Sequence, residues 1–294
     1  MATQTLVDCS QVSKAYGDNA VLHEISLSVG VGESIGLVGR NGAGKTTLLS
    51  IMQGLRRPTG GRVELFGGSP AKAKFRTELG VAPQALSLPE TARVDETINY
   101  VRAHYVNPAP VDDLIRDFGL ESFARKQAGG LSGGQKRLVA ACLAFAGNPK
   151  LVLLDEPTTG LDSDSREHLW QIIREKTHTG TSVIITSHYM EDIEQLSDRI
   201  VVLHHGRIIS DGTVTDIRGD NRVVRITVQR NIPEDLSWLE SGTLDDSRDG
   251  AFDIRTTKVD RVLEELRSRF GTLDQVEVHR DSLENIIREL TEKK

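Results

Sequence analysis

The chain has 294 residues, of which 38% are hydrophobic and 27% are charged, and its formal net charge at pH 7 is −6. This composition excludes a disordered chain, and the length allows one large domain plus a smaller one. The acidic balance argues against nucleic-acid binding, which usually needs a basic surface. The sequence has neither a signal-peptide pattern nor an apolar run of the ~20 residues that a membrane span needs. We therefore expect a protein of the cytosol or of the cytosolic face of a membrane.

Short apolar runs alternate with helical patterns as far as Gly219. Four runs predict buried strands, at residues 34–38, 151–154, 182–186 and 200–203. Helical patterns follow the first three, at residues 45–53, 164–177 and 191–196. This alternation predicts an α/β fold with a mainly parallel sheet covered by helices on both faces. Helical patterns alone fill about residues 85–149, which indicates a helical insertion.

The first predicted strand leads directly into a glycine-rich loop. This loop opens a helix and fits the pattern G-x-x-x-x-G-K-[ST], as Gly39-Arg40-Asn41-Gly42-Ala43-Gly44-Lys45-Thr46. Its glycines let backbone N–H groups converge on one anion, in front of the helix N-terminus. Lys45 would reach the β- and γ-phosphates, and the Thr46 hydroxyl can bind Mg²⁺. A chance match is the alternative, which the strand–loop–helix setting disfavours. The residues expected to hold the nucleotide are Gly39, Asn41, Gly42, Gly44, Lys45, Thr46 and Thr47.

A second glycine-rich turn precedes the helical pattern that begins near Lys136. The turn reads Leu131-Ser132-Gly133-Gly134-Gln135. Ser132 is a good helix N-cap, and the two glycines expose backbone N–H groups, so the turn is a second potential phosphate cradle. A plain cap is the alternative. Because one nucleotide has a single γ-phosphate, already held by the first loop, the second cradle suggests a second polypeptide.

The predicted strand at 151–154 ends in two carboxylates, Asp155 and Glu156, followed by Pro157. Ligands bind at this end of the strands in parallel sheets. Asp155 would hold Mg²⁺ directly or through water, and Glu156 would polarise the attacking water. Such a pair is otherwise a solvated strand end, but the phosphate loop upstream favours the catalytic interpretation.

The two cysteines and the C-terminal stretch complete the pattern. Cys9 and Cys142 are far apart and lack a C-x-x-C partner, so they predict neither a metal site nor a disulfide scaffold, and Cys142 is expected to be a packed thiol in a helix. After Gly219-Asp220-Asn221 the pattern changes to that of a small α+β domain, which gives predicted domains at 1–219 and 220–294. Val224, Ile226 and Val228 alternate with polar residues, as in a half-buried strand. Further strands are expected around 252–254 and 276–278, and helices at 259–270 and 283–290.

Together these motifs resemble the nucleotide-binding subunits of ABC transporters, over about residues 5–218. The Leu131–Gln135 pentapeptide looks like the signature motif of that family. The resemblance implies a P-loop NTPase fold with an N-terminal antiparallel β part, and ATP hydrolysis with Mg²⁺. It also implies a head-to-tail homodimer, or a heterodimer with a similar subunit, in which Ser132, Gly133, Gly134 and Gln135 cover the ATP held by the partner. A separate transmembrane permease and a peripheral position on the cytoplasmic face of the membrane are implied as well, with no nucleic-acid partner.

The same resemblance assigns four further residues. Tyr16 matches the aromatic residue that stacks on adenine, and Gln84 matches the glutamine that contacts Mg²⁺ and senses the membrane partner. Asp162 matches the loop that communicates across the dimer, and His188 matches the switch histidine at the γ-phosphate. The catalytic set would then be Glu156, His188 and Lys45, and the metal set Thr46, Gln84 and Asp155. Each of the four has a plainer alternative, namely a core or surface tyrosine, a strand-end cap, a turn aspartate and a structural histidine.

Departures from the family pattern are small. Leu138 and Leu143 stand where many members have arginine, which removes no catalytic group. His204 and His205 match no motif and are expected to be solvated loop residues.

The residues around His188 and the C-terminal stretch 281–290 are most similar to subunits of exporters of drugs, lipids or polysaccharide. Three alternatives stay open: an importer subunit served by an external binding protein, a soluble ABC ATPase acting on ribosomes or DNA, and a P-loop kinase.

Overall fold

The computed structural model describes residues 4–218, 224–229, 233, 237–248, 251–273, 276–280 and 282–292. Contacts between Cα atoms divide the chain into two compact units, Met1–Val214 and Thr215–Lys294. The predicted boundary at Gly219-Asp220-Asn221 lies outside the described residues, so the domain limits stay a prediction. Among the described residues, no helix combines the length and apolar character needed to cross a lipid bilayer.

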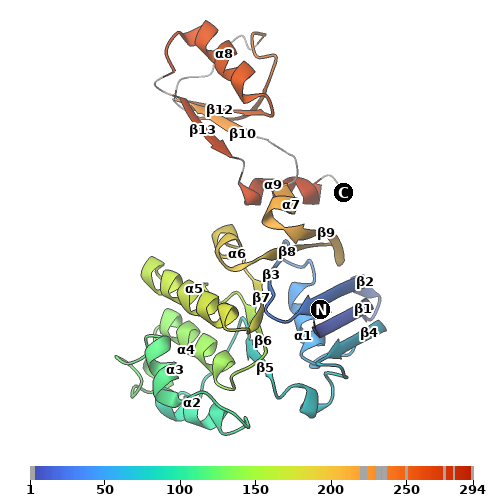
Figure 1. The fold of residues 1–294 in the computed structure, drawn as a ribbon, viewed down its shortest axis with the longest axis vertical. Helices are drawn as coiled ribbons and strands as arrows, with labels where there is room; N and C mark the ends of the chain where they lie inside the picture. Colours follow the sequence, from blue (N-terminus) through green and yellow to red (C-terminus); the bar gives the residue numbers. More distant parts are fainter. Residues whose placement is uncertain are drawn as a thin grey trace. The chain divides into compact units, whose positions relative to one another are not determined.

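The first unit is built on a six-stranded sheet with the order β5-β6-β7-β3-β8-β9 (Figure 1). Its strands are β3 (Ser34–Val38), β5 (Leu79–Ala82), β6 (Leu151–Asp155), β7 (Ser182–Thr186), β8 (Arg199–His204) and β9 (Arg207–Thr213). Neighbouring strands are parallel except β8 and β9, which pair antiparallel. The prediction of a mainly parallel sheet is therefore confirmed. The edge strand β9 was not predicted, since its mixed polar and apolar residues give no strong signal.

A second, three-stranded antiparallel sheet lies in the same unit, with the order β2-β1-β4. Its strands are β1 (Thr5–Tyr16), β2 (Asn19–Gly30) and β4 (Gly60–Leu65), which form the N-terminal antiparallel part that the family resemblance implies. Helix α1 (Lys45–Met52) packs between the two sheets, because its buried side chains Leu48, Leu49, Ile51 and Met52 share one core with residues from both.

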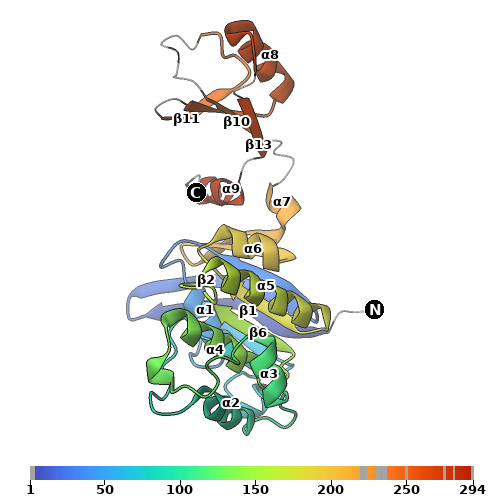
Figure 2. The ribbon, with the colours of Figure 1, turned by 90° about the vertical axis from the view of Figure 1, so that its left-hand side faces the viewer.

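The opposite face of the six-stranded sheet is covered by helices (Figure 2). These are α4 (Gly133–Phe145), α5 (Ser163–His178) and α6 (Met190–Leu196). Gly80 in β5 lets α4 approach closely, since a Cβ there would lie 1.9 Å from the carbonyl oxygen of Ala144. Gly36 does the same for α6, whose Ile193 side chain occupies the space of a Cβ.

The named elements within residues 85–149, all of which the structure describes, are helices joined by loops, and no strand lies there, as predicted. The insertion holds α2 (Val94–Arg102), α3 (Val111–Asp117), the 3₁₀ turn η2 (Ala128–Gly130) and α4; another 3₁₀ turn, η1 (Ala73–Phe75), precedes β5. Both cysteines are packed thiols. Burial raises the pKa of the Cys9 thiol to about 12 and raises that of Cys142, in α4, far above its ordinary value.

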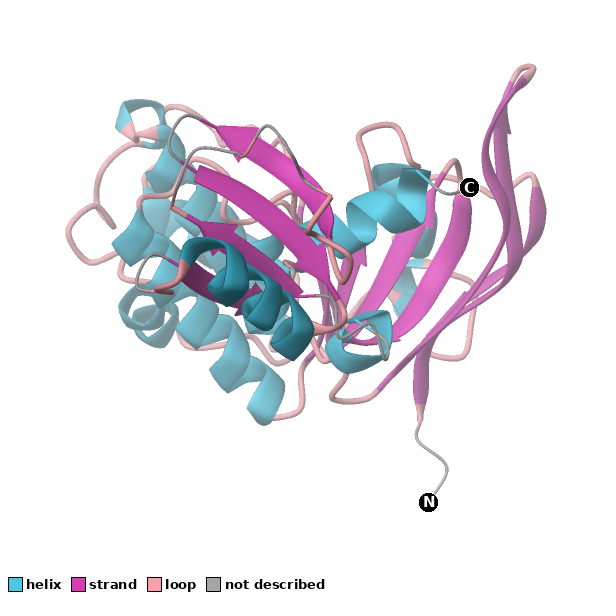
Figure 3. Ribbon diagram, turned by 90° about the horizontal axis from the view of Figure 1, so that it is seen from above, coloured by secondary structure: helices cyan, strands magenta, loops and turns pink. Residues whose placement is uncertain are grey.

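The second unit contains a four-stranded antiparallel sheet with the order β11-β12-β10-β13, crossed on one face by α8 (Figure 3). Its elements are α7 (Val214–Arg218) at the junction of the units, β10 (Val224–Val228), β11 (Thr243–Arg248), β12 (Ala251–Thr256), α8 (Val259–Phe270), β13 (Val276–Arg280) and α9 (Leu283–Glu292). Ile226, Val228, Phe252, Ile254, Val262 and Leu266 form its core. The expected strands and helices are thus present, and β11 was not predicted.

The half-buried pattern expected for residues 224–228 is wrong in the part whose side chains are described. Thr227 is buried, like Ile226 and Val228 on either side of it. Thr227 pairs with Asp253 of β12, which is also buried, and the next residue on that face, Arg255, forms an ion pair with Glu289 of α9. The second face of the sheet is therefore covered too, which local alternation could not reveal.

Candidate active site

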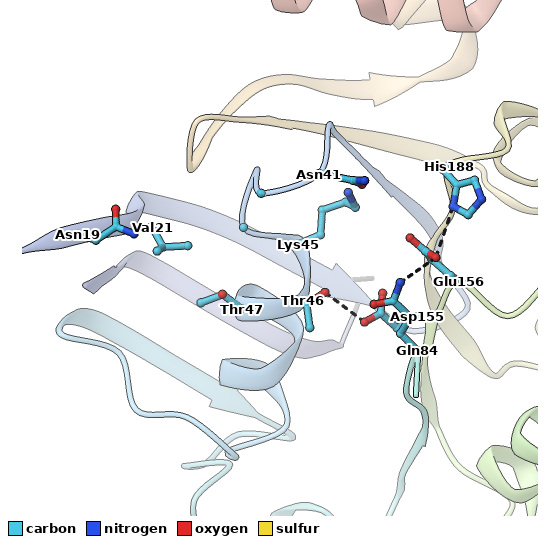
Figure 4. Close-up of a pocket in the computed structure, with 12 residues that line it drawn as sticks. Asn19, Val21, Asn41, Lys45, Thr46, Thr47, Gln84, Asp155, Glu156 and His188 are labelled. Carbon is cyan, nitrogen blue, oxygen red and sulfur yellow. Dashed lines mark hydrogen bonds and ion pairs between the residues drawn. The ribbon is translucent and has the colours of Figure 1, made fainter. Parts of the chain in front are cut away.

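The carboxyl ends of four neighbouring strands meet at one edge of the six-stranded sheet. Gln84 follows β5, Glu156 follows β6, His188 follows β7, and the 39–46 loop follows β3, in the spatial order of the strands. This is the edge where ligands bind in parallel sheets. A cavity of about 820 Å³ opens there (Figure 4). It is lined by Asn19, Val21, Asn41, Gly42, Gly44, Lys45, Thr46, Thr47, Gln84, Asp155, Glu156 and His188.

The glycine-rich loop has the conformation that its composition allows. Gly42 and Gly44 have φ values of 82° and 106°, which favour glycine. Gly39 does not line the cavity; a Cβ there would lie 2.2 Å from the carbonyl oxygen of Leu203, at the end of β8. Helix α1 begins immediately after Gly44 with no acidic residue in its first turn. Its free N–H groups and its dipole therefore face the cavity and favour an anion.

Lys45 lies across this loop and is held by it. Its ammonium donates hydrogen bonds to the carbonyl oxygens of Gly39 at 2.6 Å and Arg40 at 3.3 Å. Burial lowers the pKa of Lys45 below its ordinary value, and the nearby carboxylates of Glu156 and Asp155 oppose that shift. The cation is therefore held between the loop and the carboxylates of Asp155 and Glu156.

Asp155, at the end of β6, is hydrogen-bonded to one residue of β7 and one residue of α1. Its Oδ1 accepts a hydrogen bond from the Thr186 hydroxyl at 2.5 Å, and its Oδ2 accepts one from the Thr46 hydroxyl at 3.3 Å. Asp155 is buried. A carboxylate and a hydroxyl thus present oxygen atoms to the same corner of the cavity, which is the donor chemistry that Mg²⁺ prefers.

That corner brings together two protein oxygen atoms, Oδ2 of Asp155 and the hydroxyl oxygen of Thr46. Among the described residues, no group of three or more His, Cys, Asp or Glu side chains is arranged to bind a metal ion. A cation bound between Thr46 and Asp155 would complete its shell with water or with phosphate oxygens, as Mg²⁺ commonly does.

Glu156 stands in a strained backbone conformation. Its φ of 54° lies in the left-handed region that non-glycine residues seldom adopt. The N–H of Glu156 donates to both the carbonyl and the hydroxyl oxygen of Thr186, each at 3.0 Å. Its carboxylate Oε2 accepts a hydrogen bond from the Gln84 amide at 3.0 Å and lies 3.4 Å from Nδ1 of His188. Side chains that follow β5 and β7 therefore meet at one oxygen of the carboxylate that follows β6 (Figure 4).

The second glycine-rich turn lines a different cavity, of about 480 Å³. Ser132 caps α4 in a reciprocal pair with Gln135: the Ser132 Oγ accepts from the Gln135 N–H and the Gln135 Oε1 accepts from the Ser132 N–H, both at 3.1 Å. Asp162 lines the same cavity and caps α5 through Ser165. These hydrogen bonds lower the pKa of the Asp162 carboxyl group. No residue is shared between the two cavities, so within one chain the turn is not brought to Lys45.

Tyr16 is not among the residues that line the larger cavity. It ends β1, is 40% exposed, and has Lys14 and Arg56 about its ring at 5.0 and 5.2 Å from the centroid. Instead, Asn19 and Val21 of β2 line the cavity, and neither was predicted. Asn19 pairs with Tyr16 across the two-residue turn Gly17-Asp18. That hairpin signal next to an expected adenine-stacking residue could have identified both.

His204 is not the loop residue that was expected. It is the last residue of β8, half-buried, and pairs with Arg207 of β9. Burial, with His205 and Arg40 nearby, lowers its pKa. His205 follows in the exposed turn, as expected. The hairpin to β9, itself unpredicted, extends β8 by this one residue.

The phosphate loop on the central strand and the acidic end of the strand two places away define a P-loop nucleoside triphosphatase. A family model described as ABC transporter matches residues 22–159. The Nod factor export ATP-binding protein I of Rhizobium etli is 38% identical over 220 residues, which cover 72% of this chain and 70% of that protein. The linearmycin resistance ATP-binding protein LnrL of Bacillus subtilis is 34% identical over 233 residues, 76% of this chain and 75% of that one.

Solved structures that resemble this chain are also ATP-binding subunits or cassettes of the ABC type. The ATP-binding subunit of an ABC transporter superposes with a TM-score of 0.68 at 29% identity, over 73% of this chain and 92% of that one. The ATP-binding cassette MJ0796, solved as a dimer in a post-hydrolysis state with ADP and Pi, gives a TM-score of 0.65 at 25% identity, over 71% of this chain and 99% of that one. The chain belongs to the ABC transporter family and is an ATP-binding, ATP-hydrolysing subunit.

Proposed function

We propose that two copies of this chain pair head to tail and enclose ATP between the 39–46 loop of one copy and the Ser132–Gln135 turn of the other. The observation that carries this proposal is the presence of two anion cradles at two helix starts, α1 and α4, that line separate cavities in one chain. A cassette solved as a dimer supports the pairing. In this arrangement Asp162, beside the second cradle, lies at the interface and relays the state of one site to the other.

Several residues at the larger cavity then have roles in phosphoryl transfer to water, in which the water oxygen bonds to the γ-phosphorus while the bond from that phosphorus to the bridging oxygen of ADP breaks. The N–H groups at the start of α1 and the Lys45 ammonium bind the β- and γ-phosphates, while Tyr16 stacks on the adenine. Glu156 accepts a proton from the attacking water and aligns it with the γ-phosphorus. His188 and Lys45 stabilise the negative charge that develops on the transferred phosphoryl oxygens.

Thr46, Asp155 and Gln84 are the residues that would hold Mg²⁺. The ion supplies positive charge to the β- and γ-phosphate oxygens when it is bound. Thr46 and Asp155 already lie within hydrogen-bond distance of each other. Gln84 instead directs its amide nitrogen to Glu156, so binding the ion through its amide oxygen requires a rotation of this side chain. That rotation would release the Glu156 carboxylate toward the water.

We further propose that the chain works at the cytoplasmic face of a membrane, bound to a separate permease, as the ATPase of an exporter. Relatives named for Nod factor export, linearmycin resistance and daunorubicin resistance support the direction. Gln84 and the helical insertion would pass closure of the nucleotide site to the permease.

The reaction class is tested by phosphate release without any acceptor molecule. We expect the purified chain, with ATP and Mg²⁺, to form ADP and inorganic phosphate in equal amounts. A kinase would instead need an acceptor. Formation of ADP only when an acceptor is added, with no free phosphate, would contradict hydrolysis as the reaction.

The exporter assignment is tested by the membrane partner. We expect the affinity-tagged chain to purify from detergent-solubilised membranes with an integral membrane protein. In proteoliposomes, the turnover of the pair should need no external binding protein. A requirement for such a protein would assign the chain to an importer, and copurification with ribosomes or DNA would assign it to the soluble ATPases.

A further inference from the structure

One carboxylate lies fully buried beneath the catalytic loops. Asp192, in the first turn of α6, has no exposed surface. It does not line the nucleotide cavity, and although it lies in the exporter-like stretch around His188, the sequence pattern assigns it no role. A buried carboxylate is costly unless donors surround it, so its partners show what it holds in place.

Three donors from three segments satisfy Asp192. The hydroxyls of Thr158 and Ser187 both donate to Oδ2, at 2.5 and 2.6 Å. The indole N–H of Trp170, in α5, donates to Oδ1 at 2.9 Å. Thr158, Ser187 and Trp170 are themselves buried. A single carboxylate oxygen therefore ties the segment that follows β6 to the segment that follows β7.

Those two segments carry the proposed base and the switch histidine. Thr158 stands two residues after Glu156, and Ser187 stands immediately before His188. The Ser187 hydroxyl also accepts a hydrogen bond from the N–H of Tyr189 at 2.9 Å, so the backbone on both sides of His188 is fixed by one side chain.

The strained backbone of Glu156 needs hydrogen bonds on both sides to keep its conformation. A left-handed φ at a non-glycine residue persists only where the surrounding structure over-determines it. On the N-terminal side, the N–H of Glu156 is held by Thr186. On the C-terminal side, after Pro157, Thr158 is held by Asp192. Without that second anchor, the segment could relax and move the carboxylate away from His188.

We propose that Asp192 is a positioning residue that holds Glu156 and His188 in register for hydrolysis. It acts through the hydroxyls of Thr158 and Ser187, and touches neither ATP nor water. This inference rests on the proposed function, because it presumes that Glu156 and His188 act in the reaction.

The test removes each hydroxyl arm separately. For Thr158→Val and Ser187→Ala we expect kcat to fall about tenfold or more, while the KM for ATP and the ATP dissociation constant stay within about twofold. Thr158→Ser keeps the hydroxyl and should restore kcat to within about twofold of the parent chain. Asp192→Asn should reduce kcat at least as much as either arm. If Asp192→Asn fails to fold, the arm variants still decide the question.

Ser182→Ala is the matched control for stability. Ser182 is also fully buried and sits at the opposite end of β7, where its hydroxyl bonds the backbone of Gly30 and Gly32. We expect it to lower Tm about as much as Ser187→Ala while kcat stays within about twofold. Equal effects of Ser182→Ala, Ser187→Ala and Thr158→Val on kcat would overturn the positioning role. Normal turnover by Glu156→Gln would instead overturn the proposed function beneath it.

Discussion

Replacing Glu156 with glutamine is expected to lower kcat for ATP by roughly 10²–10⁴-fold, the usual contribution of a general base. Glutamine has nearly the same shape, so it can occupy the strained position at the end of β6. It cannot accept the proton of the attacking water. Because Glu156 does not contribute to the phosphate cradle, the ATP dissociation constant should change by no more than a few-fold. Phosphate release and equilibrium ATP binding measure the two quantities separately.

Glu167→Gln provides the matched control for this variant. Glu167 is an exposed glutamate on α5 that does not line the cavity, and its replacement removes the same charge. Its kcat should equal that of the parent chain. Hydrolysis at the parent rate by Glu156→Gln would show that another group activates the water.

Replacing Lys45 with methionine is expected to abolish ATP binding at micromolar concentrations. Methionine keeps the length of the side chain but loses the ammonium that the loop holds through Gly39 and Arg40. Removing one partner of a buried charge pair costs about 2–5 kcal/mol, which corresponds to a loss of roughly 30-fold or more in affinity. Calorimetric titration with ATP in the presence of Mg²⁺ measures the ATP affinity of the variant and of the parent chain.

Lys72→Met is the control, since Lys72 is exposed and outside the cavity. The Tm of both variants without nucleotide should be compared with that of the parent chain, because Lys45 also bonds its own loop. A Lys45→Met chain that folds normally and binds ATP with parent affinity would contradict the assignment of the phosphate site.

The sequence was most informative where structure is determined locally. The strands β3, β6, β7 and β8 were predicted to within one residue at each end, because a buried parallel strand is a continuous apolar run. The conformation of the phosphate loop follows from its glycines in the same way.

Features that depend on distant residues could not be predicted from local patterns. The order of the strands puts Gln84, Glu156 and His188 at one edge, and this pairing is invisible in the periodicity of any single strand. Asp192 has the sequence pattern of an ordinary acidic residue in the first turn of a helix. It becomes a buried anchor only because Trp170 of α5 and the two loop hydroxyls surround it.

The position of Tyr16 was the least predictable part of the site. The Gly17-Asp18 pair is a turn signal, but it does not indicate which residues of the hairpin face the cavity. In the structure Asn19 and Val21 do so, while Tyr16 contacts two cations outside the lining. Its stacking on adenine therefore remains a proposal.

The proposed composite site requires that each ATP be shared between two chains. The direct measurement is the mass in solution of the Glu156→Gln chain, by light scattering after gel filtration, with ATP and Mg²⁺ and then with ADP and Mg²⁺. We predict twice the mass of one chain with ATP and a single-chain mass with ADP, and we predict that adding Ser132→Arg to the same chain abolishes the dimer while ATP still binds. A single-chain mass with saturating ATP, or an ATP dimer that persists with Ser132→Arg, would contradict the composite site.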